Sequence, residues 1–400
     1  MKVLWVNTNF MHPTTKGGQI RTLEMLRHLN RRHEIHYVAI ENPVFPEGPA
    51  RAHEYSTKSY PYTYRIPDKG SPAFWRELMQ GLVSPMPVAV ERFHPPGMRD
   101  FLEGLIRRES FDTAVVDHLA PTSYFPRLEQ AVFFQHNVET VIWRRRAQHS
   151  SNALSRWYNR MQARRMYEYE GRVSRAAGHI VAVSERDARE MRDLFHVKHI
   201  SVIPTGVNLE YFQRPECKAE SKTDLVFVGS MDWMANVDGV LWFAREVLPI
   251  IRRKRPQCNL TIAGRLPPAD ILRLAQEDPL IRVTGTVPDI RPSIWDAKLS
   301  VVPLRIGGGT RLKIYESMAA GVAVVSTTVG AEGLSVHPPE DIRIADSAEG
   351  FAECCLELLD DEGLRRKVAA MAREMVASQY SWEQVALCFD RVFDVAPRIK

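Results

Sequence analysis

Gly307-Gly-Gly-Thr-Arg-Leu-Lys-Ile-Tyr-Glu316 is the stretch that decides the fold of this 400-residue chain. An apolar run, Ser300-Val-Val-Pro-Leu304, precedes it, and a β-branched run, Val322-Ala-Val-Val-Ser326, follows it. This order predicts a strand, a glycine-rich loop, a helix and a second strand, which is the repeating unit of a parallel sheet. Glycines let the backbone approach a ligand closely, and the unpaired amides at a helix start favour an anion. We therefore expect an anion-binding loop at the end of a buried strand.

Charged side chains follow these glycines. Arg311 suits a bidentate grip on phosphate, and Lys313 supplies a compact positive charge. Glu316, about one and a half helical turns beyond the loop, offers a carboxylate to a pair of sugar hydroxyls. The backbone positions expected to face the anion are Gly308, Gly309 and Thr310. Together these features predict a nucleotide-sugar site, and the alternative is a glycine-rich loop followed by a solvated basic helix start.

Composition and charge limit the class of protein. With 44% hydrophobic and 25% charged residues the chain is typical of soluble globular proteins, and its length predicts two domains. Its 53 basic and 48 acidic residues give a mild net charge of +5, so a basic surface has to come from local clustering. The five cysteines have neither metal-ligand spacing nor a disulfide framework, which favours a reducing compartment and no metal.

The N-terminal stretch Met1–Asn7 reads as the start of a strand, not as a signal peptide. The chain contains no apolar run of about 18 residues, the length that a membrane-spanning helix needs. We therefore expect a cytoplasmic protein.

Short apolar runs along the first half predict one parallel sheet. A Lys16-Gly-Gly18 loop after the first run opens a helix, so Gly17 and Gly18 are expected beside a ligand. Arg21, one turn into that helix, either points at the same site or is a surface arginine. The proline-rich residues 41–96 read as loops and short helices on the acceptor side. The predicted strands are Val3–Val6, His36–Ile40, Thr113–Val116, Ala131–Phe134, His179–Val183 and Ile200–Ile203.

His136 stands just beyond the run Ala131–Phe134. Ligands of open α/β sheets bind outside the carboxyl ends of the strands, so His136 is a candidate for contact with the reacting sugar. The alternative is a packed or helix-capping histidine.

The segment from Trp143 to Arg165 carries seven arginines and no acidic residue. Arg156, Arg160 and Arg164 recur at helical spacing and predict a cationic stripe beside an apolar one. Such a helix suits an anionic membrane surface, so Arg144–Arg165 is a candidate membrane contact. One alternative is a solvated helix with its apolar face in the core; another has Arg144-Arg-Arg146 gripping acceptor phosphates. Nucleic acid is the weaker interpretation, because cations and aromatics are confined to one segment.

The second half repeats the alternation of strands and helices, which predicts a second doubly wound sheet and a cleft between two domains. Gly229 begins its first strand-to-helix loop, and Val287 lies in a later loop whose backbone suits the edge of a nucleobase. We place the domains at residues 1–207 (acceptor side) and 208–378 (nucleotide-sugar side), with residues 379–400 as a final helical segment. The predicted strands are Leu225–Val228, Leu260–Ile262, Ile281–Thr284, Leu299–Val302, Val322–Val325 and Ile342–Ile344.

Several motifs together give the chain a family resemblance. It resembles the GT-B glycosyltransferases of the retaining family 4, and the Gly-Gly-Gly-Thr-Arg-Leu-Lys variant is similar to sugar transferases of bacterial exopolysaccharide clusters. The motifs that carry the resemblance are Lys16-Gly-Gly18, His136-Asn137, Pro204-Thr-Gly-Val-Asn208, Gly307–Glu316, Ala319–Val325 and Tyr380-Ser-Trp382.

The resemblance implies a transferase that moves a sugar from a nucleoside diphosphate to a lipid-linked or glycan acceptor at the inner membrane face, without metal or cofactor. It implies that the last helix crosses back onto the first domain. Gly17 and Gly18 would lie beside the diphosphate and His136 near the transferred sugar. Arg311 and Lys313 would face the diphosphate, and Glu316, the second Glu of the family's Glu-x7-Glu motif, would bind the ribose.

Two departures from the family pattern stand out. Gly308 occupies the position of the first motif Glu, and the loop from Gly229 to Asn236 lacks the Arg and Lys that many relatives have there. We expect Arg311 and Lys313 to compensate. The alternatives are a nucleotide-sugar epimerase of similar architecture and a catalytically inactive binding subunit.

Overall fold

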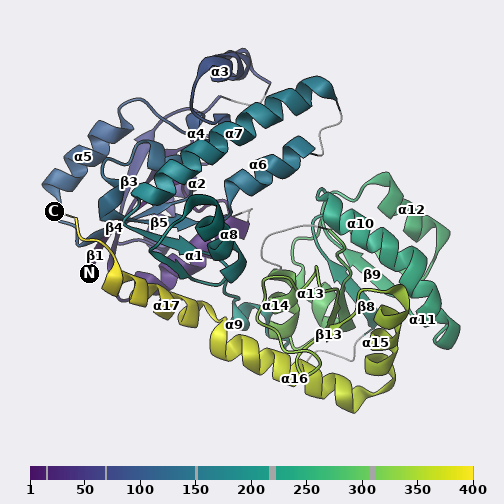
Figure 1. Ribbon diagram of the computed structural model, residues 1–400. Helices are drawn as coiled ribbons and strands as arrows, with labels where there is room; N and C mark the ends of the chain where they lie inside the picture. The colour runs from purple at the N-terminus through teal and green to yellow at the C-terminus, as the bar shows by residue number, and fades with distance from the viewer. Residues whose placement is uncertain (15–16, 68–69, 149–151, 216–221, 307–311, 400) are drawn as a thin grey trace. The chain divides into compact units, whose positions relative to one another are not determined.

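The computed structural model describes residues 1–14, 17–67, 70–148, 152–215, 222–306 and 312–399 (Figure 1). The chain folds into two compact units, each built on its own sheet. The first combines Met1–Pro204 with Val385–Lys400, and the second is Thr205–Gln384.

The first unit is built on a seven-stranded sheet in the order β3-β2-β1-β4-β5-β6-β7. Every neighbouring pair is parallel, and β1 lies beside both β2 and β4, so the chain winds outward in both directions. The carboxyl ends of β1, β4 and β5 therefore meet at one edge of the sheet. The strands are β1 Lys2–Asn9, β2 Glu34–Glu41, β3 Lys58–Thr63, β4 Thr113–Asp117, β5 Ala131–Gln135, β6 His179–Ala182 and β7 Ile200–Val202.

Helices connect these strands. Two begin at the side-chain caps that favour helix initiation: Asn152 accepts the amide of Ser155, and Ser184 accepts that of Asp187. The helices are α1 Gly17–Leu29, α2 Glu47–Ala50, α3 Pro72–Val83, α4 Val88–Glu91, α5 Met98–Arg108, α6 Glu139–Gln148, α7 Ala153–Ala176 and α8 Glu185–Phe195, with 3-10 turns η1 Ala52–Glu54, η2 Ala120–Ser123 and η3 Leu128–Gln130.

One strand corrects the sequence reading. Residues 41–96 are not only loops and short helices, because β3 pairs in parallel with β2 over Lys58–Thr63. Pro61 appeared to break a strand there. Proline has no backbone N–H to donate. It is tolerated here because β3 is an edge strand, and an N–H on its outer side would face solvent and would pair with no other strand.

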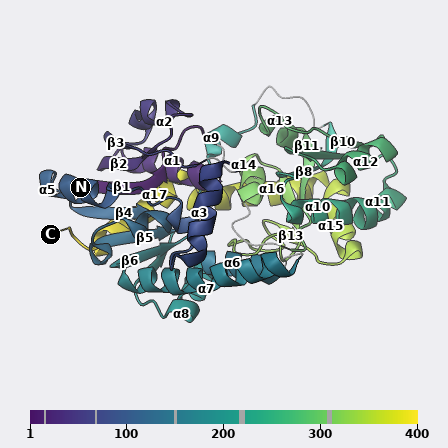
Figure 2. The same ribbon diagram turned by 90° about the horizontal axis from the view of Figure 1, so that it is seen from above.

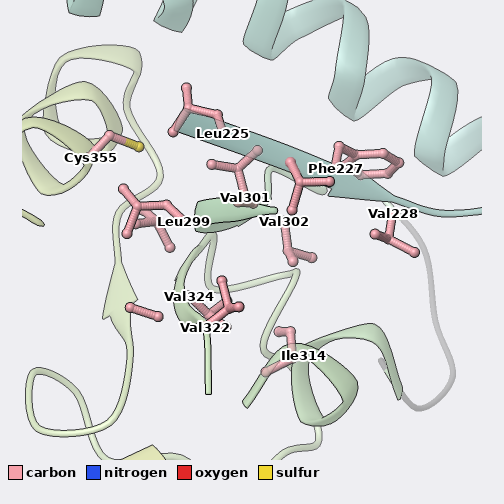
Figure 3. Close-up of a cluster of buried hydrophobic side chains, with 14 of the residues drawn as sticks. Leu225, Phe227, Val228, Leu299, Val301, Val302, Ile314, Val322, Val324 and Cys355 are labelled. Atoms are coloured by element: carbon pink, nitrogen blue, oxygen red, sulfur yellow. The ribbon is translucent and has the colours of Figure 1, made fainter. Parts of the chain in front are cut away.

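The second unit holds a six-stranded parallel sheet in the order β10-β9-β8-β11-β12-β13. Apolar side chains from the strands β8, β11 and β12 and from the helix α14 pack together in one buried core, among them Leu225, Val301 and Ile314 (Figure 3). These strands are buried on both faces, which is why they read as continuous apolar runs. The strands are β8 Thr223–Val228, β9 Leu260–Ala263, β10 Ile281–Val283, β11 Ala297–Val302, β12 Ala323–Ser326 and β13 Arg343–Ile344.

The helices of the second unit follow the predicted alternation with strands, and α15 begins at the side-chain cap of Ser347. They are α9 Leu209–Phe212, α10 Met234–Trp242, a π-helical segment η4 Phe243–Val247, α11 Leu248–Lys254, α12 Ala269–Glu277, α13 Arg291–Trp295, α14 Leu312–Ala319, α15 Ala348–Asp360 and α16 Glu362–Gln379.

The last helix, α17 (Trp382–Val395), returns the chain to the first unit (Figure 1). The ring of Phe389 packs against those of Trp5 and Phe134, with centroids 5.3 and 5.5 Å apart. Asp390 lies 2.9 Å from Nε2 of His33. The predicted return of the C-terminal helix is therefore confirmed. No described helix is long and apolar enough to cross a bilayer.

Candidate functional site

A buried polar hub lies at the carboxyl edge of the first sheet. The carboxylate of Asp117, the last residue of β4, accepts hydrogen bonds from Trp5, Asn7, Thr22 and His136, with distances of 3.0, 2.8, 2.9 and 2.7 Å. Burial alone raises the pKa of Asp117, but the two nearby histidines and the donated hydrogen bonds outweigh it and hold this pKa well below its usual value. Asp117 therefore remains ionised and fixes the side chains around it.

His136 follows β5 and is buried. Burial and the neighbouring His118 lower the pKa of His136 to about 3, so its ring is neutral. Because Nε2 donates to Asp117, Nδ1 is the acceptor, and this buried atom has no hydrogen-bond partner among the residues that the structure describes. A Cβ built on Gly18 would lie 3.5 Å from Cε1 of His118 and 3.7 Å from Nδ1 of His136, so Gly18 of α1 lies against both imidazole rings. Geometrically, His136 is a packed histidine at the expected strand end.

His118 is the more accessible histidine of this site, and the sequence reading missed it. Its ring stacks on that of His136 with centroids 3.9 Å apart, and its side chain is 35% exposed. Its backbone has a φ of 74°, a left-handed conformation that non-glycine residues seldom adopt outside special sites. The available signal was Asp117-His118 just beyond the run Thr113–Val116, the same relation to a strand that singled out His136.

Asp117, His118 and His136 are also residue types that can bind a metal ion. The ligand atoms of Asp117, His118 and His136 all lie within 4.8 Å of one another. The two imidazole planes are only 24° apart and stacked, so their in-plane lone pairs point side by side and do not converge on one ion. This arrangement suits hydrogen bonding, and the expectation of a metal-free site stays a prediction.

Arg21 lies one turn into α1, which begins at Gly17. Its side chain is buried, so the surface-arginine alternative is wrong. Burial lowers the pKa of Arg21 to about 10, and the charges of Asp187 and Asp117 oppose that change. The guanidinium therefore stays charged at neutral pH and adds a fixed cation to this edge of the sheet.

Lys313 is the centre of the site in the second unit. Its Nζ donates to Oδ1 of Asn236 over 2.8 Å, and Asn236 in turn donates to the carbonyl of Ser230 over 2.7 Å. The ammonium lies 4.4 Å from the centre of the Phe227 ring. A Cβ on Gly229 would come within 2.6 Å of Nζ. The predicted residues Lys313 and Gly229 thus meet at the carboxyl end of β8.

Glu316 lies one helical turn beyond Lys313 in α14 and keeps partial exposure. Burial raises the pKa of Glu316 to about 7, and the charge of Lys313 acts in the opposite direction. A carboxyl group near half-ionisation at neutral pH stands to lose its proton when hydroxyl donors bind it.

Val287 is half-buried in the loop after β10, where Gly285 has a φ of 65°. Asp289 fixes the far end of that loop by accepting from Arg291 at 2.7 Å, and the Arg291 guanidinium stacks 3.9 Å from the Tyr211 ring centre. The remaining predicted positions, Gly308, Gly309, Thr310 and Arg311, lie outside the described residues.

Residues 15–211 match the sequence profile described as Glycosyltransferase Family 4, and residues 222–361 match Glycosyl transferases group 1. An uncharacterized protein of the cps region of Klebsiella pneumoniae is 23% identical over 169 residues, 40% of this chain and 44% of that protein. The glycogen synthase of Mycobacterium tuberculosis is 24% identical over 264 residues, 61% of this chain and 60% of the synthase. The chain spans about half the length of these curated relatives.

The fold has close counterparts among solved structures. The structure of Anabaena HepE in complex with UDP superposes with a TM-score of 0.66, at 11% identity, over 98% of this chain and 100% of HepE. At that identity the likeness concerns the fold alone: two Rossmann-like α/β domains, the GT-B architecture. Because the two sequence profiles account for most of the chain and the fold agrees with them, we assign this chain to the GT-B glycosyltransferases of family 4.

Proposed function

We propose that this protein transfers a sugar, with retention of configuration, from a nucleoside diphosphate sugar to a lipid-linked or glycan acceptor. The observation that carries the proposal is the Lys313 ammonium at the carboxyl end of β8, with Glu316 one turn further along α14. A cation beside a glycine and a carboxylate within one helical turn suit a diphosphate joined to a ribose. The UDP in the HepE complex supports this class of donor.

Each residue has a role in the proposed reaction. Lys313, with Arg311, neutralises charge on the leaving diphosphate, so no metal or other cofactor is needed. Glu316 accepts hydrogen bonds from the ribose, and the backbone near Val287 faces the base. Catalysis then consists mainly of positioning and charge stabilisation. At the first sheet, the partly exposed His118 would contact the transferred sugar, with the buried His136 stacked behind it, and Gly17, Gly18 and Arg21 would lie beside the diphosphate.

The contact between Lys313 and Asn236 supports the proposed compensation for the missing loop cations. The loop from Gly229 to Asn236 contains neither Arg nor Lys. The Lys313 ammonium nevertheless lies against that loop, because Asn236 accepts its hydrogen bond there. A cation supplied from α14 thus takes the place that a loop cation has in many relatives.

We further propose a cytoplasmic enzyme of cell-surface polysaccharide synthesis, a role consistent with its relative from the cps region. Its Arg144–Arg165 segment would face an anionic membrane, and nucleic acid is not among the proposed partners.

A panel of UDP-, GDP- and ADP-sugars tests the proposal. A donor that binds only the folded protein raises its melting temperature, and the same donor is then assayed for sugar transfer and slow hydrolysis. We expect one nucleotide to stabilise the protein and its sugar to be released with retention. Binding of the donor without turnover would indicate an inactive binding subunit. Interconversion of the free donor sugar would indicate an epimerase. Absence of donor binding would refute the proposed function.

Donor binding should depend on pH through Glu316. Because burial raises the pKa of Glu316 to about 7, the empty site holds protonated and ionised carboxyl in similar amounts near neutrality. Ribose hydroxyls donate to the ionised form, so donor affinity should rise about tenfold from one pH unit below this pKa to one unit above it. Calorimetry measures this, and Glu316→Gln should show a flat profile. A flat wild-type profile would contradict the role of Glu316.

Gly229→Ala should impair the enzyme without unfolding it. The added Cβ would lie 2.6 Å from Nζ of Lys313, a flexible side-chain end, so the ammonium moves instead of the backbone. We expect kcat/KM to fall on the order of 10- to 100-fold, with the stability changed by less than about 1 kcal/mol. The comparison variant is Gly264→Ala, whose Cβ would lie 1.8 Å from the Gly229 carbonyl oxygen. That variant should also lower the melting temperature; equal activity of Gly229→Ala and wild type would refute the prediction.

A further inference from the structure

Helices α6 and α7 form an arginine-rich hairpin on the first unit, packed along each other (Figures 1 and 2). Its sequence from Trp143 to Arg165 contains seven arginines and no Asp or Glu. Arg144-Arg-Arg146 near the end of α6 is exposed, and residues 153–160 at the start of α7 include no buried side chain. The outer end of the hairpin is therefore a strongly cationic surface, unlike the chain as a whole.

Large apolar side chains lie exposed among these arginines. Leu154 is 75% and Trp157 56% exposed, one helical turn apart on α7, and Ile142 on α6 is 45% exposed. Arg156 and Arg160 flank them at helical spacing. The apolar stripe thus begins outside the core: the core-packing alternative holds for the half-buried Tyr158 and Met161 further along, but is wrong for Leu154 and Trp157.

Helix α3 extends the surface that α6 and α7 form. On α3, Trp75 is 57% and Met79 64% exposed, four residues apart and so on one face. Arg165 of α7 donates to the carbonyl oxygen of Gly81 in α3, which ties the two helices together. Helices α3, α6 and α7 therefore carry the exposed apolar side chains of this surface, and most of its cations come from α6 and α7.

We infer that α3 and the α6–α7 hairpin are the docking face for an anionic phospholipid bilayer. Aromatic and aliphatic side chains set among arginines match the interface of such a bilayer, where apolar groups reach the acyl boundary and cations stay at the headgroups. The seven arginines of Trp143–Arg165 are complementary to that surface, although Arg164 also pairs with Glu168 one turn further along α7. A second copy of this chain would meet the same seven positive charges.

This inference rests on the proposed function, because docking brings the enzyme to a lipid-linked acceptor. The two fail separately. Donor binding and donor hydrolysis are measured in solution without lipid, whereas docking is measured on vesicles without donor.

Vesicle co-sedimentation tests the docking face. The full chain should bind vesicles of phosphatidylcholine mixed with phosphatidylglycerol, bind pure phosphatidylcholine far less, and lose affinity as salt is raised. Replacing Arg156, Arg160 and Arg164 together by Gln should weaken binding on the order of 100-fold. Leu154→Ser with Trp157→Ser should weaken it about tenfold, because the apolar insertion is lost while the charge remains.

The matched control replaces Arg99, Arg107 and Arg108 of α5 by Gln, since these arginines are exposed on another helix of the same unit. It should bind vesicles within about twofold of wild type, because these charges lie outside the docking face. Unchanged donor binding verifies that each variant is folded. Equal binding to neutral and anionic vesicles, an equal effect of the α5 control, or tighter binding to duplex DNA than to vesicles would overturn the inference. A dimer that only the α7 variants disrupt would overturn it in favour of self-association.

Discussion

Replacing Lys313 by alanine is expected to lower kcat by on the order of 100- to 1000-fold, the largest effect on activity that we predict for a single described residue. The ammonium is held 2.8 Å from Oδ1 of Asn236 and 4.4 Å from the Phe227 ring centre, so it is preorganised before the donor binds. Negative charge on the diphosphate grows as the bond to the sugar breaks. A fixed cation therefore stabilises the transition state more than the bound donor, and kcat should fall more than donor affinity.

Lys313→Met separates the charge from the rest of the side chain. Methionine keeps an unbranched apolar stem beside Phe227 but removes the ammonium, so the fold should be kept and the rate lost. Lys298→Ala is the matched control: this lysine of β11 pairs with Asp224 over 2.8 Å, near the amino-terminal ends of β11 and β8. Its activity should stay within about twofold of wild type, because it lies at the opposite edge of the sheet from Lys313. Full activity of Lys313→Met in steady-state assays would remove Lys313 from the mechanism.

The sequence predicted the sheets well because buried parallel strands are continuous apolar runs. Every predicted strand is present, and β3 is the addition. Its sequence, Lys58-Ser-Tyr-Pro-Tyr-Thr63, has a proline between two tyrosines and no continuous apolar run, and a proline at this position is tolerated in an edge strand. The apolar pattern that reveals a strand in the sequence reflects how deeply the strand is buried, and the edge strand β3 is only partly buried. The return of α17 came from family resemblance; its aromatic contacts with Trp5 are long-range and leave no local signal.

The site was predicted less completely, for a related reason. Lys313 and Gly229 were both candidates from the sequence, because glycines and strand ends are visible there, but their contact with each other was not predicted. The sequence did not distinguish His136 from His118, because which histidine is buried depends on the packing around them: the His136 ring lies against those of His118 and Phe134, whereas His118 stays partly exposed. The partner of Lys313 was also invisible: Asn236 lies 77 residues away. These contacts depend on tertiary packing, which the local sequence pattern does not reveal.

Asp117 carries the largest stability effect that we predict. Asp117→Ala removes the acceptor from four buried donors, those of Trp5, Asn7, Thr22 and His136. Buried donors without partners are costly, so the free energy of unfolding of the first unit should fall by about 4 kcal/mol. Urea-dependent hydrogen exchange of the β4 and β5 amides measures this unit by itself. The control, Asp112→Ala, removes one exposed bond to the amide of Lys2 and should cost under about 1 kcal/mol.

The buried polar hub around Asp117 also determines whether the stability of the first unit rises or falls with pH. The pKa of His136 is lowered by burial from 6.5 to about 3, so the unfolded chain binds this proton at a higher pH than the folded one. Stability from this group is present above pH 6.5 and is lost as pH falls toward 3, by at most about 1.4 kcal/mol per pH unit. Asp117, whose pKa is held below its usual value, adds a further loss at the acid end. His136→Asn should flatten the upper part of this profile. If wild type and variant lost stability equally between neutral and mildly acidic pH, His136 would not be the neutral, buried member of the hub.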